Sequence, residues 1–341
     1  MNNTTLNTEG HSISFRNYIN SAIYIAVFLF GSTGNIFVLL IVKRKRIRRF
    51  NDVFIVNLAV ADLCMILFFI PPYTYKELSD FRGSKFFCKS VWSLITVSFC
   101  CSIFTITTMA VYRCRVIVHP FEPPIRKRQL IPLITGIWLS SIILAFPLML
   151  LGTYEAGNAN CSENWPSETH QRVYTSILMV LQYFLPLLII AIAYVLIAID
   201  LTRSKAQPTG DNTHIMGQAR REENIRVIKV LATIILAFAI CMLPGHIAWM
   251  LLHFGGKREK AAAGYIFYFS DHLAIIHTCL NPIIYGTLTK RFRQGYVKYL
   301  SYIFCCSYYN RKKSHSVRRN GATSEMRTFG SLKDEGEDDE K

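Results

Sequence analysis

The sequence predicts an all-α membrane protein, a seven-transmembrane helix bundle with a short amphipathic eighth helix. The first observation behind this prediction is composition, because 51% of the 341 residues are hydrophobic and only 18% are charged. The second is distribution: long segments of the chain carry almost no charge, and short segments carry many charges. About 20 apolar residues are enough for a helix to cross a bilayer core of roughly 30 Å. The third is that strongly basic segments follow every second apolar segment, as expected of a chain that crosses a membrane repeatedly.

Seven apolar runs are long enough to be membrane helices. They lie at residues 19–42, 53–75, 86–111, 130–151, 173–199, 227–254 and 261–288. A helix satisfies its backbone hydrogen bonds internally where no water is available. A buried core helix of a soluble protein would explain any one run, but it does not explain seven in succession joined mostly by short loops.

The basic residues fall on one side of the membrane if the seven runs alternate in direction. They include the segments KRKRIRR (43–49) and KRFR (290–293). The positive-inside rule makes that side cytoplasmic, so we expect a multi-pass protein of the plasma membrane with an extracellular N-terminus. The net charge of +16 is then explained by orientation in lipid, and no nucleic-acid partner is expected. Glycosylation sequons at Asn2, Asn3 and Asn160 lie on the predicted outer side.

The same topology organises the chain and its cysteines. We expect an extracellular tail (1–18), a seven-transmembrane domain with its eighth helix (19–303) and a disordered cytoplasmic tail (304–341), since the last segment is too polar to fold alone. Cys88 and Cys161 both face the oxidising side and form the natural disulfide pair. Cys305 and Cys306 follow an amphipathic cytoplasmic stretch, where palmitoylation is plausible.

Polar and kinked positions inside the spans invite a functional explanation. A charged group costs roughly 2.5–3.5 kcal/mol at the centre of a membrane helix on insertion scales. Asp62 is such a group, and Ser102 and Asn281 are candidate partners on other spans. Two interpretations of Asp62 have equal weight: a satisfied polar core, and a cation or proton site. A cation site here would hold an allosteric sodium ion. Pro244 and Pro282 each remove a helical hydrogen bond and are expected to kink their spans.

Taken together, these residues resemble the rhodopsin-like (class A) G-protein-coupled receptors. The resemblance runs over residues 24–306 and rests on motifs in family order. They are GN with Asn35, LAVAD with Asp62, Trp138, Pro186 with Tyr194, Pro244, and NPIIY with Asn281, Pro282 and Tyr285. Cys88 also lies 25 positions before Arg113, the family's spacing between its disulfide and its arginine. Within the family, the segments IHTCLNPIIY and TVSFCCSIFTITTMAV look most like the peptide-binding branch, near the galanin, allatostatin and RFamide-type receptors.

The resemblance implies a mechanism of activation. Arg113 looks like the arginine of the family's Asp-Arg-Tyr motif, which lines the cytoplasmic cleft that receives a heterotrimeric G protein. Tyr194 and Tyr285 are implied to close around it. The chain departs from the pattern at Tyr112, which replaces the acid, and at Met242, where the family usually has a tryptophan. Two hypotheses follow: a weaker resting clasp with raised basal signalling, or a receptor that binds ligand with weak G-protein output.

The ligand site is expected between the outer halves of the spans. The candidate residues are Tyr73, Glu77, Trp92, Thr96, Phe99, Gln182, His246, Trp249, Tyr268 and Asp271. Ordinary helix packing is an equally weighted explanation for the aromatic ones. Ile95 stands where amine receptors carry an aspartate, and Ile275 stands where opsins carry the retinal lysine, so both classes are disfavoured. The acids Glu77 and Asp271 favour a neuropeptide with basic residues, with a chemokine-like or lipid ligand as the alternative.

The leading function is therefore a peptide receptor that activates a G protein, and the alternative is an atypical receptor that captures ligand with weak or no coupling. Arrestin and receptor kinases are further expected partners at the C-terminal tail, and membrane lipid surrounds the spans. An enzyme is not expected, because the sequence contains no nucleophile–base or metal-ligand cluster. A transporter is disfavoured because no matching halves with paired broken helices are found.

Overall fold

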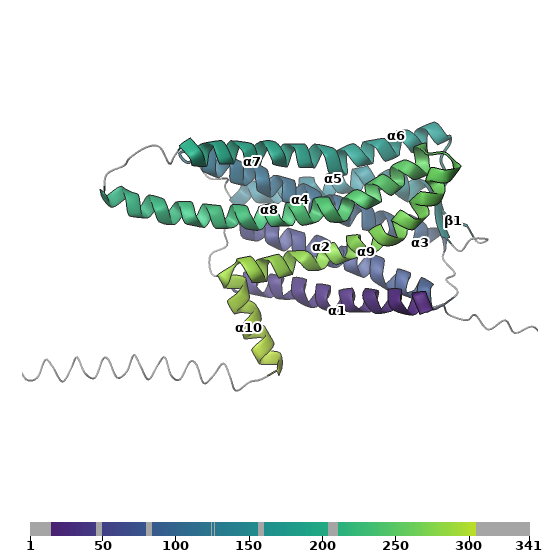
Figure 1. Cartoon of the computed structure of the whole chain (residues 1–341), viewed down its shortest axis with the longest axis horizontal. Helices are drawn as coiled ribbons and strands as arrows, with labels where there is room; N and C mark the ends of the chain where they lie inside the picture. Colours follow the sequence, from purple (N-terminus) through teal and green to yellow (C-terminus); the bar gives the residue numbers. More distant parts are fainter. Residues whose placement is uncertain are drawn as a thin grey trace, which may run out of the picture. The chain divides into compact units, whose positions relative to one another are not determined.

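The computed structural model describes residues 15–45, 50–79, 84–123, 125, 127–155, 160–203 and 211–304. The chain divides into two compact units, Met1–Thr289 and Lys290–Lys341, which are described separately. The first unit is a bundle of long helices with one small β-hairpin (Figure 1). The predicted all-α class with a helix bundle is confirmed.

The spans follow one another in the predicted order. The first two spans are α1 (Phe15–Lys43) and α2 (Phe50–Leu78), and the third consists of α3 (Lys85–Phe87), η1 (Cys88–Trp92) and α4 (Ser93–Val118). The fourth is α5 (Lys127–Leu151), and the fifth consists of α6 (Glu168–Met179), η2 (Val180–Phe184) and α7 (Leu185–Arg203). The sixth and seventh are α8 (Asp211–Phe254) and α9 (Lys257–Leu288). Six of these spans are long and apolar enough to cross a membrane by length and composition. The seventh, α9, is more polar and carries Asp271, His277 and Asn281.

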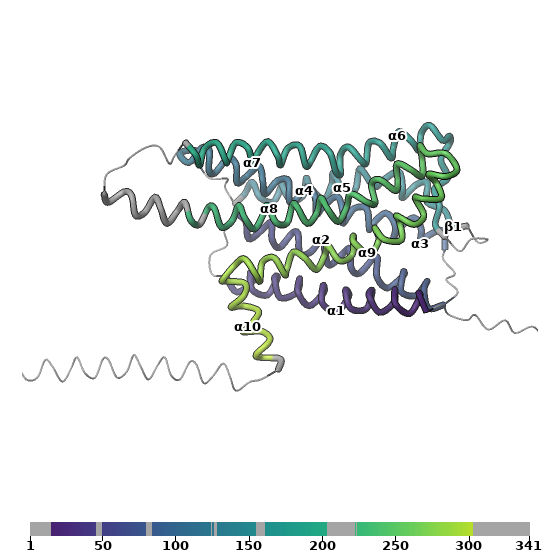
Figure 2. Tube along the Cα trace, in the orientation of Figure 1, coloured from purple at the N-terminus to yellow at the C-terminus, as the bar shows by residue number. Residues whose placement is uncertain are grey.

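The helices of the first unit form a closed ring. α1 packs against α2, α2 packs against α4, and α4 contacts both α5 and α7. α9 packs against both α8 and α1, so the last span closes the ring onto the first (Figure 2). The inward faces are apolar; Leu58, Ile103 and Ile275, for example, are fully buried. Some residues on these inward faces are polar and buried, and each of them needs a hydrogen-bond partner in the protein or in a ligand.

Two glycines bring α1 close to its neighbours. A Cβ atom at Gly34 would lie 2.9 Å from the Cβ atom of Pro282 on α9. One at Gly31 would lie 2.7 Å from the Cδ1 atom of Ile66 on α2. A side chain at Gly34 would therefore collide with the rigid ring of Pro282, whereas one at Gly31 would require the end of the Ile66 side chain to move.

We call the end of the bundle where Leu78, Cys88 and Leu151 lie the disulfide end. There β1 (Gly152–Glu155) and β2 (Asn160–Glu163) form an antiparallel hairpin, which the sequence did not predict. The predicted disulfide between Cys88 and Cys161 is present and joins the hairpin to the start of the third span. We call the opposite end, where Lys43, Phe50 and Val118 lie, the arginine end.

Several helices are longer or less regular than the apolar runs. α1 begins at Phe15 and α6 at Glu168, each one turn or more before its run, and α8 already begins at Asp211. Polar helical turns such as these escape a search for apolar segments. The third and fifth spans each contain a π-helical turn, η1 and η2, and such turns add one residue and redirect the side chains around them.

The second unit contains α10 (Lys290–Phe304), the short helix expected after the seventh span. Its basic residues begin the helix, and its apolar side chains include Phe292 and Tyr296, whose ring centroids lie 6.3 Å apart. The helix by itself therefore has the amphipathic character that the sequence predicted.

Candidate functional site

At the arginine end, Tyr112 makes an aromatic contact that the sequence did not predict. Its ring stacks on that of Phe50 in the first turn of α2, with centroids 3.6 Å apart and an interplanar angle of 19°. Phe50 in turn contacts the buried Phe54, at 4.7 Å between centroids. The residue that replaces the family's acid beside Arg113 therefore holds α4 to α2 through its ring.

Arg113 and Tyr194 bring three helices together at this end. Arg113 lies in the last part of α4, and its charge acts on the phenol of Tyr194 in α7. The Tyr194 hydroxyl donates a hydrogen bond to the carbonyl oxygen of Ile228 in α8, at 3.3 Å. Tyr285 in α9 is buried. Of the activation residues predicted here, Arg113 and Tyr194 are thus brought together, and their connection to α8 runs through the backbone.

Midway along the bundle, Asp62 lies among oxygen-bearing side chains. Asp62 is buried, with 1% of its surface exposed, and its Oδ2 atom accepts a hydrogen bond of 2.8 Å from the Asn281 side-chain amide. Ser102 also hydrogen-bonds the Asp62 carboxylate. Among the described residues, the Asn281 Oδ1 atom has no hydrogen-bond partner. The predicted residues Asp62, Ser102 and Asn281 therefore do lie together. The Asn281 Oδ1 atom is an acceptor that no described residue uses.

A second buried network joins the helices next to this trio. The Asn57 side-chain amide donates to Thr105 Oγ1 at 2.7 Å, and its Oδ1 atom accepts from the Trp138 indole at 2.9 Å. The network links α2, α4 and α5. On α1, Asn35 donates to the carbonyl oxygens of Gly31 and Thr278, each at 3.0 Å, and so ties α1 to α9. The motif residues Trp138 and Asn35 therefore have structural roles.

Toward the disulfide end, four rings form an aromatic cluster on α4, η2 and α8. Phe99 lies 5.6 Å from Phe238 and 6.1 Å from His246, and Tyr183 lies 5.0 Å from His246, all between ring centroids. The His246 Nε2 atom is buried without a hydrogen-bond partner in the described part of the chain. Sequence reasoning had missed Tyr183, which the π-helical turn η2 places inside the bundle. Such a cluster can hold an apolar or aromatic ligand group.

Two other predicted ligand residues, Gln182 and Thr96, make hydrogen bonds within the protein. Gln182 is buried and donates to the Cys100 thiol at 3.0 Å. The Thr96 hydroxyl donates to the carbonyl oxygen of Trp92 in its own helix, at 3.4 Å. These hydrogen bonds fix the positions of the Gln182 and Thr96 side chains, and they leave both side chains with fewer hydrogen-bonding groups for a ligand.

A second group of predicted residues lies between α1, α2 and α9. The Tyr268 hydroxyl donates to the Asn20 side chain at 2.6 Å, and Tyr73 stacks on Phe69 with centroids 3.9 Å apart. The charge of Asp271 acts on Tyr73. It also acts on Tyr24, as does that of Glu77, and Tyr24 stacks on His272 at 5.4 Å. The acids Glu77 and Asp271 therefore share one aromatic environment, which the sequence could not show for residues 194 positions apart.

The loop between β2 and α6 buries an acid that the sequence would leave in solvent. The Trp165 indole donates to the Glu163 carboxylate, and the Trp165 ring lies 5.0 Å from that of Tyr174. Burial raises the pKa of Glu163, and the hydrogen bonds from Trp165 and Gln171 offset part of this shift. Glu163, the last residue of β2, is therefore packed beneath the loop and helps to hold the loop in place through Trp165.

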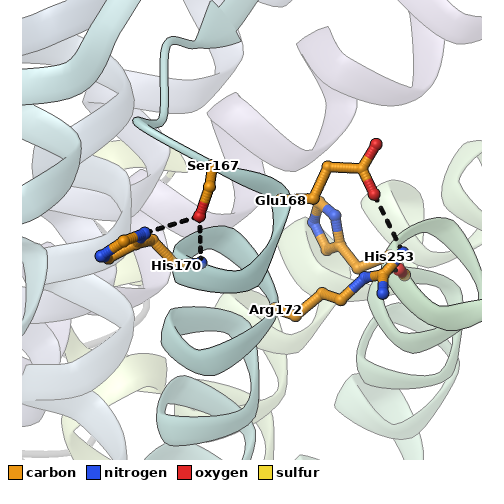
Figure 3. Close-up of polar contacts among 5 residues, drawn as sticks. All are labelled: Ser167, Glu168, His170, Arg172 and His253. Atoms are coloured by element: carbon orange, nitrogen blue, oxygen red, sulfur yellow. Dashed lines mark hydrogen bonds and ion pairs between the residues drawn. The ribbon is translucent and has the colours of Figure 1, made fainter.

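The fifth and sixth spans are joined at the disulfide end by Arg172 (Figure 3). Its Nε–H group donates to the carbonyl oxygen of His253 at 3.0 Å, and an Nη2–H group donates to Glu168 at 3.0 Å. Ser167 caps α6 by accepting from the His170 backbone N–H, and it hydrogen-bonds the His170 ring at 2.7 Å. These contacts fix the start of α6 against the end of α8.

Some predicted modification sites are not described. Asn2, Asn3, Cys305 and Cys306 lie outside the described residues, and for Asn160 only the backbone is described. Among the residues that are described, no three His, Cys, Asp or Glu side chains come together as a metal site would require.

The comparisons with known proteins agree with this geometry. The model of the 7 transmembrane receptor (rhodopsin family) matches residues 34–285. The substance-P receptor of Mus musculus is 32% identical over 285 residues, which cover 81% of this chain and 69% of that protein. The substance-K receptor of Homo sapiens is 31% identical over 306 residues (86% and 75%). The somatostatin receptor type 5 of Bos taurus is 30% identical over 307 residues (87% and 80%). The likeness to galanin, allatostatin and RFamide-type receptors stays a prediction. This chain belongs to the rhodopsin family of seven-transmembrane receptors, and it is a multi-pass membrane receptor, not an enzyme.

Proposed function

We propose that this protein is a plasma-membrane receptor for an extracellular peptide and that it activates a heterotrimeric G protein. The disulfide end faces outward and the arginine end faces the cytoplasm, in accord with the basic segments of the sequence. The observation that carries the proposal is the junction of Arg113, Tyr194 and the Ile228 carbonyl, which links α4, α7 and α8 at the arginine end. The relatives named as substance-P, substance-K and somatostatin receptors support a peptide ligand.

The mechanism is a shift between two populations of the bundle. A ligand can favour the state with an open cytoplasmic cleft only by binding that state more tightly than the closed one. The Tyr194 hydroxyl must release the carbonyl oxygen of Ile228 for the cleft to open, because this hydrogen bond holds α7 to the backbone of α8. The guanidinium of Arg113 remains charged in both states, which suits a latch with two positions.

The peptide contacts two regions at the disulfide end. The aromatic cluster around His246 takes an apolar or aromatic group of the peptide. Trp249 lies three residues further along α8, where its ring stacks on that of His253. Glu77 and Asp271 take a basic group, since both carboxylates act on the same aromatic side chain, Tyr24. A peptide of several residues is needed to reach both regions.

A ligand-capturing receptor with weak or no coupling is the second candidate. Tyr112 favours it because its ring is engaged with Phe50 and supplies no carboxylate to Arg113. Met242 also favours it, because a flexible thioether stands where the family usually has the tryptophan that moves on activation.

The experiment that separates these functions is ligand-free nucleotide exchange on a panel of G proteins. The variants are Tyr112→Asp and Arg113→Ala, with Arg115→Ala as the control, because Arg115 makes only an exposed ion pair at the same end. We expect exchange in the wild type, none in Arg113→Ala, and wild-type exchange in the control. Tyr112→Asp should show less exchange than the wild type, because the new carboxylate restrains Arg113 more than loss of the stack on Phe50 releases the resting state. Exchange that is absent from the wild type and gained in Tyr112→Asp would favour the ligand-capturing receptor.

An allosteric sodium ion at Asp62, Ser102 and Asn281 forms part of the proposal. Hard cations take oxygen ligands, and the Asn281 Oδ1 atom has no partner among the described residues. The test is thermal stability in sodium chloride against choline chloride at equal ionic strength, with Asp62→Asn as the variant. Sodium should stabilise the wild type alone, and equal stabilisation of both proteins would exclude the site.

The remaining expectations concern modification and regulation. Palmitoylation at Cys305 and Cys306 and glycosylation at Asn2, Asn3 and Asn160 follow from the proposed orientation. Arrestin and receptor kinases are proposed to act on the C-terminal tail. Mass spectrometry of the intact receptor from a cell membrane tests the modifications directly.

A further inference from the structure

A buried histidine with an unused nitrogen lies at the disulfide end, where α6, α8 and α9 meet. His253, in the last turn of α8, exposes only 9% of its surface. Its Nε2 atom is buried and has no hydrogen-bond partner among the described residues. The ring stacks on Trp249 with centroids 5.5 Å apart and an interplanar angle of 17°, so its plane is fixed. A buried polar group without a partner is costly and calls for an explanation.

The groups around His253 are cationic. Arg172 and Lys260 both act on its ring with their positive charges. Arg172 also donates to the His253 carbonyl oxygen, and its guanidinium lies 6.0 Å from the centre of the Phe254 ring. We call Arg172, His253 and Lys260 the His253 cluster.

The ion pair of Arg172 with Glu168 does not neutralise this cluster. Glu168 has 81% of its side-chain surface exposed, and Arg172 has 45% exposed. Exposed pairs contribute only about 0–1 kcal/mol, because water and salt screen them. A carboxylate from outside can therefore take the place of Glu168, and Arg172 has further N–H groups to offer it.

The start of α9 adds to the positive potential. Its N-cap residue, Gly256, has no side chain that could cap the helix, and a Cβ atom at this position would lie 3.0 Å from the Oε2 atom of Glu259. The first turn nevertheless carries Lys257, Arg258 and Lys260, with Glu259 as its acid. Basic residues at a helix N-terminus oppose the helix dipole, whereas an anion there is favourable. Three basic residues therefore lie at the end of α9 where the helix dipole makes positive charge unfavourable.

We infer that the His253 cluster binds an oxyanion, a carboxylate or sulfate group, carried by the extracellular ligand. The His253 Nε2–H group, the guanidinium of Arg172 and the ammonium of Lys260 are all donors, and hydrogen bonds from charged donors to such anions are short and strong. The inference rests on the proposed function for the identity of the ligand as a peptide. Together with Glu77 and Asp271 near α1 and α2, the cluster implies a peptide with a basic group and an acidic group at separate positions.

The test measures anion binding by the full-length receptor in nanodiscs of uncharged lipid. The probes are N-acetyl-aspartate amide and sodium sulfate, against N-acetyl-asparagine amide and sodium chloride at matched ionic strength. The thermal unfolding midpoint is followed against probe concentration, because a ligand of the folded state raises it saturably. The variants are Lys260→Gln, Arg172→Gln and His253→Phe, and Lys85→Gln is the matched control, since Lys85 is an exposed base at the same end on α3.

We expect a saturable rise with at least one anion in the wild type and in Lys85→Gln, and about tenfold weaker binding in Lys260→Gln. Sulfate also stabilises proteins without binding a site, so the difference between these two variants is the decisive quantity. A response to the carboxylate alone indicates an acidic residue or C-terminus in the ligand, and a response to sulfate alone indicates a sulfated one. No saturable response in the wild type, or equal responses in Lys85→Gln and Lys260→Gln, would overturn the inference. Because no G protein takes part, failure of the proposed coupling leaves this result unaffected.

Discussion

The stack between Tyr112 and Phe50 should couple the two residues energetically. Replacing either residue with alanine removes the contact between the rings. Because the double replacement removes the same contact only once, its destabilisation should be smaller than the sum of the two single destabilisations. Aromatic pairs contribute about 0.5–1.5 kcal/mol beyond their buried area, with ring centroids usually about 4.5–7 Å apart in offset or edge arrangements. Here the rings are nearly parallel and only 3.6 Å apart. This approaches the less favourable face-to-face arrangement, so we expect a coupling in the lower part of the range, about 0.5–1 kcal/mol.

A double-mutant cycle measures this coupling. The unfolding free energies of Phe50→Ala, Tyr112→Ala and the double variant are compared with the wild type in mixed micelles. The control cycle pairs Tyr112→Ala with Phe30→Ala, because Phe30 is 77% exposed on α1 and makes no ring contact with Tyr112. The control cycle should be additive.

The same coupling should appear in signalling if the stack holds the resting state. A loss of about 0.5–1 kcal/mol changes a two-state equilibrium about two- to fivefold, since about 1.4 kcal/mol corresponds to tenfold. Ligand-free nucleotide exchange by Phe50→Ala should therefore rise about two- to fivefold above that of the wild type. A Tyr112–Phe50 cycle as additive as the control, together with unchanged exchange, would refute the reasoning.

Three further predictions concern stability. Burial raises the pKa of Glu163, so the folded protein binds the proton of this carboxyl group more tightly than the unfolded chain does. The resulting stabilisation is complete below the pKa of the unfolded chain, about 4.3, and is lost as the pH rises through the higher pKa of the folded protein. Thermal unfolding across this range should show that loss in the wild type and not in Glu163→Gln. Gly34→Val should lower the unfolding free energy by about 1–3 kcal/mol through overpacking, since its Cβ atom would lie 2.9 Å from Pro282, whereas Gly136→Val, which meets nothing within 4 Å, should not; equal midpoints would contradict this. Reducing the disulfide, whose cysteines are 73 residues apart, should destabilise the fold by about 4 kcal/mol in the chain-entropy view, and an unchanged midpoint under reductant would argue against it.

The predicted ligand residues illustrate what could be read from the sequence and what could not. Phe99, His246 and Trp249 were identified by their places relative to the motifs, and their rings do take part in aromatic contacts at the disulfide end. Gln182 was identified in the same way, yet its amide is bonded to Cys100. Spacing along a helix determines the face on which a side chain lies, but the partner depends on which neighbouring helix is in contact.

The sequence by itself determined the number and order of the spans, the pairing of Cys88 with Cys161 and the position of Arg113 at the end of the third span. These features depend on local hydrophobicity, on charge and on short motifs, all of which are properties of consecutive residues. The boundaries of α6 and α8 were harder to predict, because the first turns of both helices are polar in sequence and a search for apolar segments does not find them.

Only the tertiary structure decided the contacts that give the site its chemistry. The stack of Tyr112 on Phe50 and the hydrogen bond from Arg172 to the His253 carbonyl oxygen join residues that are far apart in the chain. Such pairs depend on how the helices are rotated and shifted against one another, and the π-helical turns η1 and η2 change that rotation within a span. Rotation and shift are set by side-chain packing between helices, for which a single sequence carries no separate signal.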